Sequence, residues 1–234
     1  MTSFRKWLTG LRHTPLHPQW LLGSRSLPPN MSDLEGRVLD IGAADRWLEP
    51  HIPTAAEYWA LDYPATGQDM YGAKPDVFAD GAQLPFADQT FTTVFCLEVL
   101  EHVPYPMQVM QELSRVLKPG GHAYISMPFL YPLHDAPYDY QRYTAYGLRR
   151  DAEGAGLEVI QIQPTGHAMR TVGLLACLAL AGGASGGPLW RQVVLLTLAA
   201  PMVLGINLTA WLLSWFWPNW SHIQHGHTLI GVKK

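Results

Sequence analysis

The chain has 234 residues and a formal net charge of −3. This length suits one sizeable domain or two small ones, and the charge gives no indication of nucleic-acid binding. Only 15% of the residues are charged and nine are tryptophan, which hints at unusual apolar exposure. The two cysteines, Cys96 and Cys177, lie far apart in apolar runs. A disulfide framework is therefore not expected, and a reducing compartment fits.

The N-terminal segment, residues 1–35, is basic and amphipathic. Residues 1–32 contain no acid, and the apolar run is too short for a secretory signal peptide. One helical face would carry Phe4, Trp7, Leu8 and Leu11. This pattern suits a helix formed by residues 1–12 on an anionic membrane surface. It suits equally an amphipathic helix packed on the domain.

The remaining elements alternate between strands and helices. Apolar runs predict strands at 37–41, 58–61, 76–79, 92–97, 122–127, 157–162 and 228–232. Helical spacing predicts helices at 106–117 and 144–155, the second with Thr144 as its N-cap. Such alternation predicts an α/β fold: a Rossmann-like, mostly parallel seven-stranded sheet with helices on both faces.

Polar residues follow the predicted strands, at the edge where parallel sheets bind ligands. Asp62 comes about 20 residues after the glycine turn that begins at Gly42, a spacing that suits an acid binding two ribose hydroxyls. Asp80 would accept a hydrogen bond from an exocyclic amine. The turn lacks the second and third glycines of a dinucleotide-binding site, which disfavours a nicotinamide-dependent oxidoreductase. Acids without basic neighbours, apart from Arg46, favour a cationic nucleoside.

The sequences VLDIGAADRWLEP, YWALD, ADGAQLPFADQTFTTVFCLEVLEHV and LSRVLKPGGHAYISMPF carry a specific family resemblance. Over residues 36–166 the chain resembles the class I S-adenosylmethionine-dependent methyltransferases with a type 11-like methyltransferase domain. The resemblance implies a cofactor site for S-adenosylmethionine. Asp40 and Gly42 would line its methionine end, followed by Ala44; Asp62 would bind the ribose; Asp80, Gly81 and Leu84 would meet the adenine; and Cys96 and Leu97 would offer backbone near the methionine.

Three positions depart from the family's pattern. Ala44 stands where a second glycine is expected, Arg46 replaces a third, and Thr92 stands where an Asp is common. The alanine adds a Cβ where the backbone nears the ligand and would weaken cofactor binding. The acids are retained, so we expect binding to survive.

The segment LYPLHDAPYDYQRYT, residues 130–144, follows the fifth strand and fits no helix or strand period. The catalytic candidates are His134, Asp139 and His102, because a hydroxyl acceptor must lose its proton. Arg142 would bind an acidic group of the acceptor, and Tyr138, Tyr140 and Tyr143 would shape its pocket. In the alternative interpretation Asp139 and Arg142 pair to fix the loop, and His102 hydrogen-bonds loop backbone.

The histidines in SHIQHGHT, at 222, 225 and 227, match no strong zinc pattern, so no metal site is expected. Residues 167–221 form an apolar insertion that precedes a last strand in 222–234. Residues 171–190 and 192–218 carry no charge, and the second stretch is long enough to span a bilayer. Because both ends of the insertion join one sheet, a single crossing is excluded. A membrane hairpin, helices lying on the membrane, and buried helices that form a lid or dimer interface remain open.

These observations predict an S-adenosylmethionine-dependent methyltransferase that acts on an oxygen of a small, glycan-like or lipid-linked acceptor. We expect it to be cytoplasmic, at the inner face of a membrane contacted through residues 1–12 and 171–218, and not to bind nucleic acid. The alternative is a catalytically inactive, cofactor-binding relative that serves as a membrane-associated partner subunit.

Overall fold

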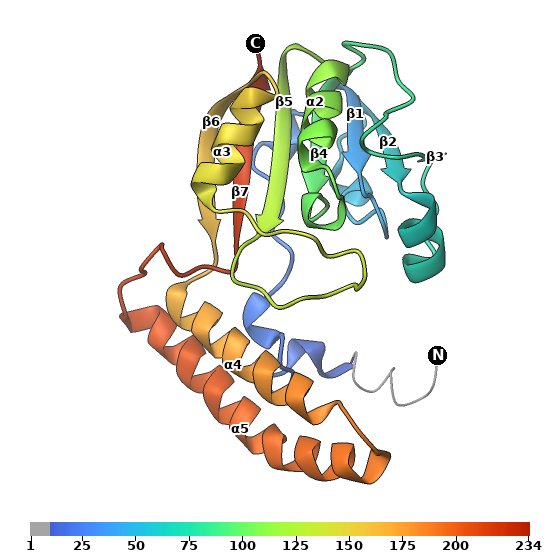
Figure 1. The fold of residues 1–234 in the computed structure, drawn as a ribbon. Helices are drawn as coiled ribbons and strands as arrows, with labels where there is room; N and C mark the ends of the chain where they lie inside the picture. The colour runs from blue at the N-terminus through green and yellow to red at the C-terminus, as the bar shows by residue number, and fades with distance from the viewer. Residues whose placement is uncertain (1–9) are drawn as a thin grey trace. The chain divides into compact units, whose positions relative to one another are not determined.

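The computed structural model describes residues 10–234, apart from the side chains of residues 69–71 (Figure 1). The chain divides into two compact units. The α/β unit contains Ser26–Phe129, Leu133–Gln163 and Gly226–Lys234. The helical unit contains residues 10–25, Leu130–Pro132 and Pro164–His225. The helix predicted for residues 1–12 lies mostly outside the described residues.

The α/β unit is built on a seven-stranded sheet in the order β3-β2-β1-β4-β5-β7-β6. The predicted strand count and the mostly parallel arrangement are confirmed: β1 pairs in parallel with β2 and β4, and β7 runs antiparallel to β5. The strands are β1 Gly36–Ile41, β2 Ala56–Asp62, β3 Val77–Phe78, β4 Phe91–Leu97, β5 Leu117–Pro128, β6 Leu157–Thr165 and β7 Gly226–Lys233.

The two faces of the sheet are covered differently. Helices α2 (Pro106–Val116) and α3 (Ala145–Gly154) pack on one face, where Val109, Leu113 and Leu148 join the main core. Within the α/β unit the other face carries the short 3-10 turns η3 (Met31–Asp33) and η4 (Glu49–His51), in place of the full helices expected there. The segments after β1 and β3 are too short for long crossover helices. After β2 the chain forms η5 (Pro64–Tyr71), a π-helix.

The predicted helices are confirmed to within a residue or two, and the main boundary difference is at β5. The strand predicted at 122–127 begins earlier, at Leu117, directly after α2, and includes the Pro-Gly-Gly run that follows Lys118. The pairing register shifts between Phe91 and Thr93, and Gly120 has a φ of 76°. A glycine at positive φ lets an irregular strand start follow a helix without a separate loop.

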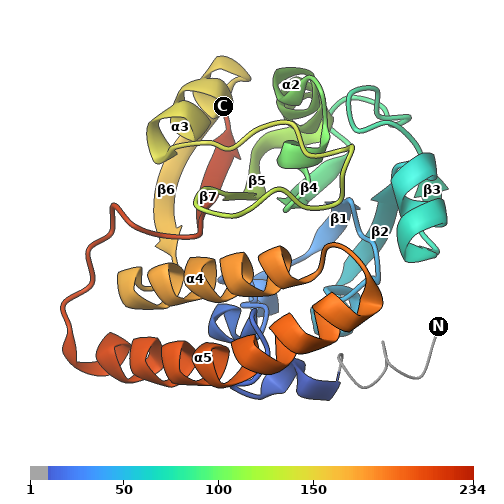
Figure 2. The same ribbon diagram turned by 60° about the horizontal axis from the view of Figure 1, so that its bottom comes forward.

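The helical unit is dominated by two antiparallel apolar helices, α4 (Ala168–Ala184) and α5 (Leu189–Phe216) (Figure 2). The 3-10 turns η1 (Leu11–His13) and η2 (Trp20–Leu22) belong to the same unit. Leu21 packs with Leu174 and Ala210 in a small core. In the described part of the chain, α5 is the one helix long and apolar enough to cross a membrane, and its most apolar stretch is only 22% buried.

Candidate active site

A tight turn after β1 begins the site at the carboxyl edge of the sheet. Gly42 has a φ of 73°, and a Cβ there would lie 2.4 Å from a methyl group of Val99, so only glycine fits. Ala44 and Arg46 also have positive φ, 44° and 54°. The backbone therefore keeps a left-handed turn at the two positions where the sequence has lost glycine. Such a conformation is strained for a residue with a Cβ.

Asp62, the predicted ribose-binding acid, ends β2 beside this turn. Its Oδ2 accepts a hydrogen bond of 2.8 Å from the amide of Ala44, and its Oδ1 accepts one of 2.8 Å from Tyr63. Gly67 lies against the carboxyl group, where a Cβ would be only 2.7 Å away. Burial raises the pKa of Asp62, and the two amides partly oppose that rise. The carboxylate is thus held rigidly at the turn.

Arg46 is fully engaged within the protein. Its guanidinium bonds to Glu49 at 2.8 and 2.9 Å and to Asp76 at 3.1 Å. Asp76 in turn accepts a hydrogen bond of 2.8 Å from the amide of Ala60 in β2. The arginine therefore ties the turn to the neighbouring strands. Asp76 was not among the residues expected to matter, although its position beside the third strand is visible in the sequence.

Asp40 lies on the sheet face opposite α2 and is 3% exposed. It accepts a hydrogen bond of 2.6 Å from the hydroxyl of Tyr58 in β2. Burial raises the pKa of Asp40 to about 7, and the nearby charge of Asp62 adds to the rise. A buried carboxyl poised near neutrality would gain from a cationic neighbour, which is the chemistry expected at the methionine end of the cofactor.

The other predicted cofactor residues occupy the same edge or the core beneath it. Asp80 follows β3 and accepts a hydrogen bond of 2.8 Å from the amide of Ala82. Gly81 packs near Ile41. Leu84 was expected to lie against the adenine, but it is 4% exposed and belongs to the main core. Leu84, in the sequence LPF, therefore packs in the core below the carboxyl edge of the sheet. Cys96 is fully buried, while Leu97 ends β4 at the edge.

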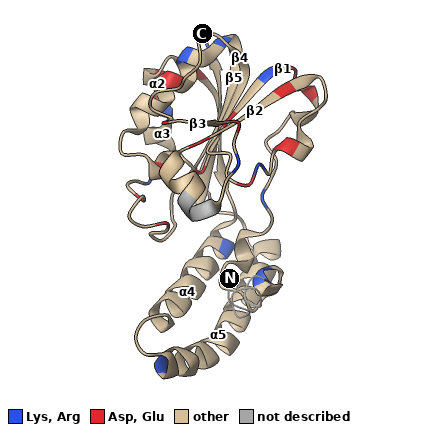
Figure 3. Cartoon of the chain, turned by 90° about the vertical axis from the view of Figure 1, so that its right-hand side faces the viewer, with Lys and Arg blue, Asp and Glu red and all other residues tan. Residues whose placement is uncertain are grey.

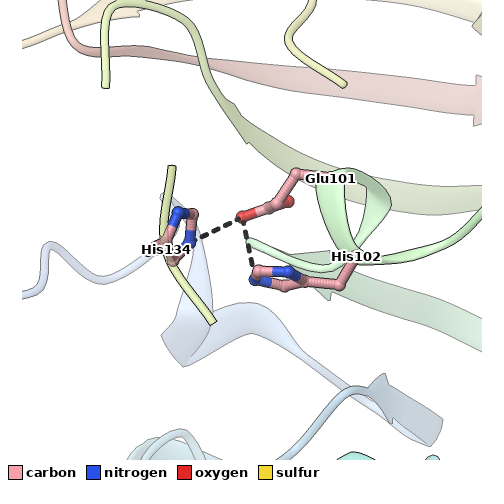
Figure 4. A group of neighbouring side chains, drawn as sticks. All are labelled: Glu101, His102 and His134. Atoms are coloured by element: carbon pink, nitrogen blue, oxygen red, sulfur yellow. Dashed lines mark ion pairs between the residues drawn. The ribbon is translucent and has the colours of Figure 1, made fainter. Parts of the chain in front are cut away.

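The second half of the site is a cluster formed by Glu101, His102 and His134 (Figure 4). Glu101 and His102 lie in η6 (Leu100–His102), after β4, and His134 lies in the loop after β5. Oε1 of Glu101 is 3.6 Å from Nε2 of His102 and 4.0 Å from Nε2 of His134. The two imidazole rings are 4.8 Å apart, edge to face.

Glu101 is the unexpected member of this cluster. Its side chain is fully buried, and among the described residues neither carboxyl oxygen has a hydrogen-bond partner. Burial raises the pKa of Glu101 well above its usual range, and the charge of Glu98 adds to this. Buried polar groups are nearly always paired, so this carboxyl group marks a functional position. The motif EVLEHV contains it, but only the adjacent histidine stood out in the sequence.

Hydrogen bonds set the orientation of both histidines. Nδ1 of His102 is 2.8 Å from the carbonyl oxygen of Tyr138, which can only accept, so this nitrogen carries the proton. Burial lowers the pKa of His102, which leaves it neutral with a lone pair on Nε2. Nδ1 of His134 is 3.2 Å from Asp139 and 3.4 Å from Arg142. Because a guanidinium only donates, the bond from Arg142 needs a lone pair on Nδ1, whereas the contact with Asp139 needs a proton on the same nitrogen. The Nε2 atoms of both histidines lie on the side of Glu101.

Asp139 and Arg142 support His134 from behind. Their side chains form a bidentate ion pair, which lowers the pKa of Asp139 to about 2. Asp139 also accepts a hydrogen bond of 2.8 Å from the backbone amide of His134. The alternative in which these two residues pair to fix the loop is therefore the observed geometry. Arg142 is paired with Asp139 and also donates to the carbonyl of Gln141 at 2.9 Å.

The tyrosines of the loop have separate roles. The Tyr143 hydroxyl donates a hydrogen bond of 2.6 Å to Asp151 of α3, which ties the loop to that helix. Tyr138 contributes its carbonyl to His102, and the amide of Tyr140 donates to the carbonyl of Glu101 at 2.8 Å. The Tyr140 side chain is exposed. Gln141, which sequence reasoning missed, donates to the carbonyl of Val103 at 2.8 Å.

The cluster can do two kinds of chemistry. Two imidazole groups and a carboxyl group can exchange protons with an acceptor, and their nitrogen and oxygen atoms are also of the kinds that bind a divalent metal ion. Their ligand atoms lie within 4.8 Å of one another. The sequence predicted no metal site, because His222, His225 and His227 match no strong zinc pattern. Over residues 10–234 those three belong to no such group.

Comparisons with known proteins bear on the family and the fold of the chain. Residues 39–125 match the family described as "Methyltransferase domain". The resemblance to class I S-adenosylmethionine-dependent methyltransferases that the sequence predicted is thereby confirmed for this part of the α/β unit. The ubiquinone biosynthesis O-methyltransferase of Cronobacter sakazakii is 31% identical over 135 residues, which cover 52% of this chain and 55% of that protein. The biotin biosynthesis bifunctional protein BioHC of Cellvibrio japonicus is 40% identical over 97 residues, covering 38% of this chain and 19% of that one.

The fold is shared with proteins of different chemistry. The crystal structure of the [4+2]-cyclase SpnF matches with a TM-score of 0.53 and 18% identity, covering 86% of this chain and 77% of that one. This chain spans little more than half the length of the curated methyltransferase and a fifth of the bifunctional protein. A methyltransferase fold alone does not define the reaction, so the function must be argued from the site.

Proposed function

We propose that the protein is an S-adenosylmethionine-dependent methyltransferase that methylates an oxygen of a small, glycan-like or lipid-linked acceptor near a membrane face. The observation that carries the proposal is the buried, unpartnered carboxyl of Glu101 facing two histidine Nε2 atoms. Glu101 follows β4 by four residues, at the same sheet edge as the acid that ends β2. A cofactor-binding edge and an acceptor-activating cluster are thus combined in one unit.

The cofactor half rests on its carboxyl groups. Asp62 would bind the ribose hydroxyls, since a rigidly held carboxylate accepts two hydrogen bonds from them. Asp40 would stabilise the positively charged methionine end. Asp80 would accept from the adenine amine. The supporting relative is an O-methyltransferase, and the matching family is described as a methyltransferase domain.

The reaction would be an in-line displacement. The acceptor oxygen forms a bond to the methyl carbon while the carbon–sulfur bond breaks, and the electron pair of that bond stays on sulfur as S-adenosylhomocysteine forms. The proton of the acceptor hydroxyl passes to Nε2 of His134, which Asp139 orients through Nδ1. A positioned base contributes about 10²–10⁴-fold. Holding the two reactants in line contributes further through proximity.

The same three ligand atoms would also hold a divalent cation. Nδ1 of His102 is bonded to a carbonyl oxygen, and Nδ1 of His134 lies 3.2 Å from Asp139; an oxygen acceptor at this position is the usual support for a metal-binding imidazole. A bound cation would supply Lewis-acid polarisation of the acceptor oxygen and lower the pKa of its hydroxyl. Isothermal titration with Mg²⁺, Mn²⁺ and Zn²⁺ alone tests this. Binding lost in both His102→Ala and Glu101→Gln supports a metal role, and absence of binding leaves the histidines as proton acceptors.

The helical unit supports the proposal that the protein acts at a membrane. The α5 helix is long, apolar and mostly exposed, and α4 beside it is also apolar. A methyltransferase attached to such a unit would meet acceptors that partition into lipid. We place the α/β unit on the cytoplasmic side, where S-adenosylmethionine is made, and we propose no nucleic-acid partner.

Single-turnover methyl transfer from labelled S-adenosylmethionine tests the function. The acceptors would be phenolic, sugar and lipid-linked hydroxyl compounds presented in detergent micelles. Glu101→Gln should slow transfer by about 10²–10⁴-fold while retaining cofactor binding. Glu153→Gln, at an exposed acid on α3, should behave as wild type. Transfer by the Glu101→Gln variant at the wild-type rate would refute the assigned role of the cluster.

A non-catalytic, cofactor-binding partner subunit is the second candidate, favoured by one observation. Ala44 and Arg46 have left-handed backbone conformations at positions where the family has glycine. Their Cβ atoms would keep a ligand farther from the backbone than glycine would. Cofactor binding with no transfer to any acceptor class would favour this candidate. Methyl transfer by the Ala44→Gly variant would instead support the proposal that the protein is an enzyme.

A further inference from the structure

The α4–α5 hairpin has no polar face. Residues 171–190 and 192–218 contain no charged side chain, and Figure 3 shows the two helices uncoloured except for basic residues near their ends. The side chains of Val194, Leu198, Met202, Leu208 and Leu212 are between 44% and 62% exposed. Exposed apolar side chains of this size along a whole helix require a partner that covers them.

The observed burial excludes two environments for α5: the core of a soluble domain and the plane of a membrane surface. A helix that is apolar on all sides is normally the buried helix of a core or a membrane span, and the apolar stretch of α5 is only 22% buried. A helix lying in the plane of a membrane surface needs a strongly polar face opposite its apolar one. In α5 the buried positions Ala199, Val203, Asn207 and Ala210 face inward, and the exposed positions are apolar.

The spacing of the tryptophans matches a bilayer. Trp190 lies at the start of α5 and Trp211 lies near its end, next to Trp20, whose ring is 6.3 Å away. At 1.5 Å per residue, Trp190 and Trp211 are about 32 Å apart along the helix. A hydrocarbon core is about 30 Å thick, and tryptophan concentrates at both of its interfaces.

The polar side chains inside the hairpin are bonded to protein. Nδ2 of Asn207 donates to the carbonyls of Pro15 and His17, at 2.7 and 3.0 Å, and its Oδ1 is 3.4 Å from the Cys177 thiol. Thr197 donates to the carbonyl of Val193, one turn earlier, at 2.7 Å. Backbone and side-chain groups in lipid must be paired within the protein. The hairpin meets this condition at these positions.

The loop between the helices also satisfies its own carbonyl groups. The Ser185 hydroxyl bonds to Gly182 at 2.7 Å, Arg191 bonds to the carbonyl of Gly186, and Gln192 bonds to that of Gly187 at 2.8 Å. Arg191 and Gln192 form a polar end that suits an interface, directly beside Trp190. The far end of the hairpin thus has both an aromatic and a basic interfacial residue.

Chain connectivity then fixes the number of crossings. The hairpin leaves from β6 and returns to β7, and these strands are neighbours in one sheet. Both ends must therefore be on one side of the membrane. The shorter helix α4 has 17 residues, which is at the lower limit of a bilayer-spanning helix. We propose that α4 and α5 form a two-pass transmembrane hairpin whose loop, residues 185–188, reaches the membrane interface opposite the one where the hairpin begins and ends. This topology does not depend on methyl transfer, and it gives the membrane contact in the proposed function a defined form.

Cysteine labelling tests the topology with the full chain in its membrane. Ser185→Cys places a thiol in the exposed loop, and Ser221→Cys is a matched exposed position after α5. Native Cys96 and Cys177 are buried, so the unmodified chain provides the background. Each variant is treated with a membrane-impermeant maleimide in right-side-out and in inverted vesicles, after alkaline carbonate extraction has shown whether the chain stays in the membrane.

The proposal expects the two variants to label from opposite sides, each at least tenfold above its signal from the other side. Labelling of both from the same side, or no labelling of Ser185→Cys until detergent is added, overturns the crossing. Release of the chain by carbonate also overturns it. Cofactor binding measured on the same preparations is a separate readout, so loss of the topology and loss of the proposed enzyme function can be told apart.

Discussion

Replacing Asp40 by Asn should stabilise the protein at alkaline pH and much less at acidic pH. The carboxyl group is 3% exposed and its pKa is raised from 3.8 to about 7, chiefly by burial. Because the folded pKa lies above the unfolded one, the stability contribution of this group is complete below pH 3.8 and is lost as pH rises through 7. The full loss is on the order of 4 kcal/mol at 1.36 kcal/mol per tenfold change. The amide oxygen of Asn would still accept the hydrogen bond from Tyr58.

The assay is urea unfolding of wild type and Asp40→Asn at about pH 5 and about pH 8.5. The free energy of unfolding of the variant, relative to wild type, should increase by roughly 3 kcal/mol between these two values. Asp33→Asn, at an exposed carboxylate in η3, is the control and should show no comparable change. A difference between Asp40→Asn and wild type that does not vary with pH would refute the claim that this carboxyl is held near neutrality by burial.

The other predictions use different readouts. The affinity for S-adenosylmethionine should rise up to about tenfold from pH 6 to pH 7, because the cation favours ionised Asp40, and Asp40→Asn should remove this dependence in calorimetry. Glu101→Gln should slow single-turnover transfer by about 10²–10⁴-fold with unchanged cofactor affinity, whereas equal losses in both would indicate misfolding. Ala44→Gly should raise the free energy of unfolding by about 1 kcal/mol in urea, because the residue has positive φ; Ala87→Gly should lower it. Met202→Lys, in mid-α5, should disfavour membrane integration by about 3 kcal/mol, seen as carbonate-extractable protein, while Met202→Leu stays integrated.

Much of the fold could be predicted because strong local patterns agree with the tertiary structure. The buried strands around Asp40 and Asp62 are short apolar runs that end in an acid, and α3 begins at Thr144, whose hydroxyl accepts from Gly147 at 3.1 Å. The start of β5 could not be predicted from the same signals. Pro-Gly-Gly is a helix-ending pattern, and only pairing with β4 draws Leu117 into the sheet.

The site was partly visible in the sequence. His102, His134, Asp139 and Arg142 were recognised as candidates, and the structure brings them together because the segments after β4 and β5 are adjacent. Glu101 was not recognised, since its importance comes from complete burial without a partner, which no spacing reveals. The spacing also did not reveal the hydrogen bond from the Tyr143 hydroxyl to Asp151, which lies two turns into the following helix.

The most direct test of the central claim is calorimetric binding of S-adenosylmethionine and S-adenosylhomocysteine to the purified full chain, with Asp62→Ala and Asp62→Asn alongside. The account predicts that wild type binds both ligands and that both variants remain folded by circular dichroism but lose measurable binding. A folded wild type that binds neither ligand, or an Asp62→Ala variant that binds as tightly as wild type, would contradict it.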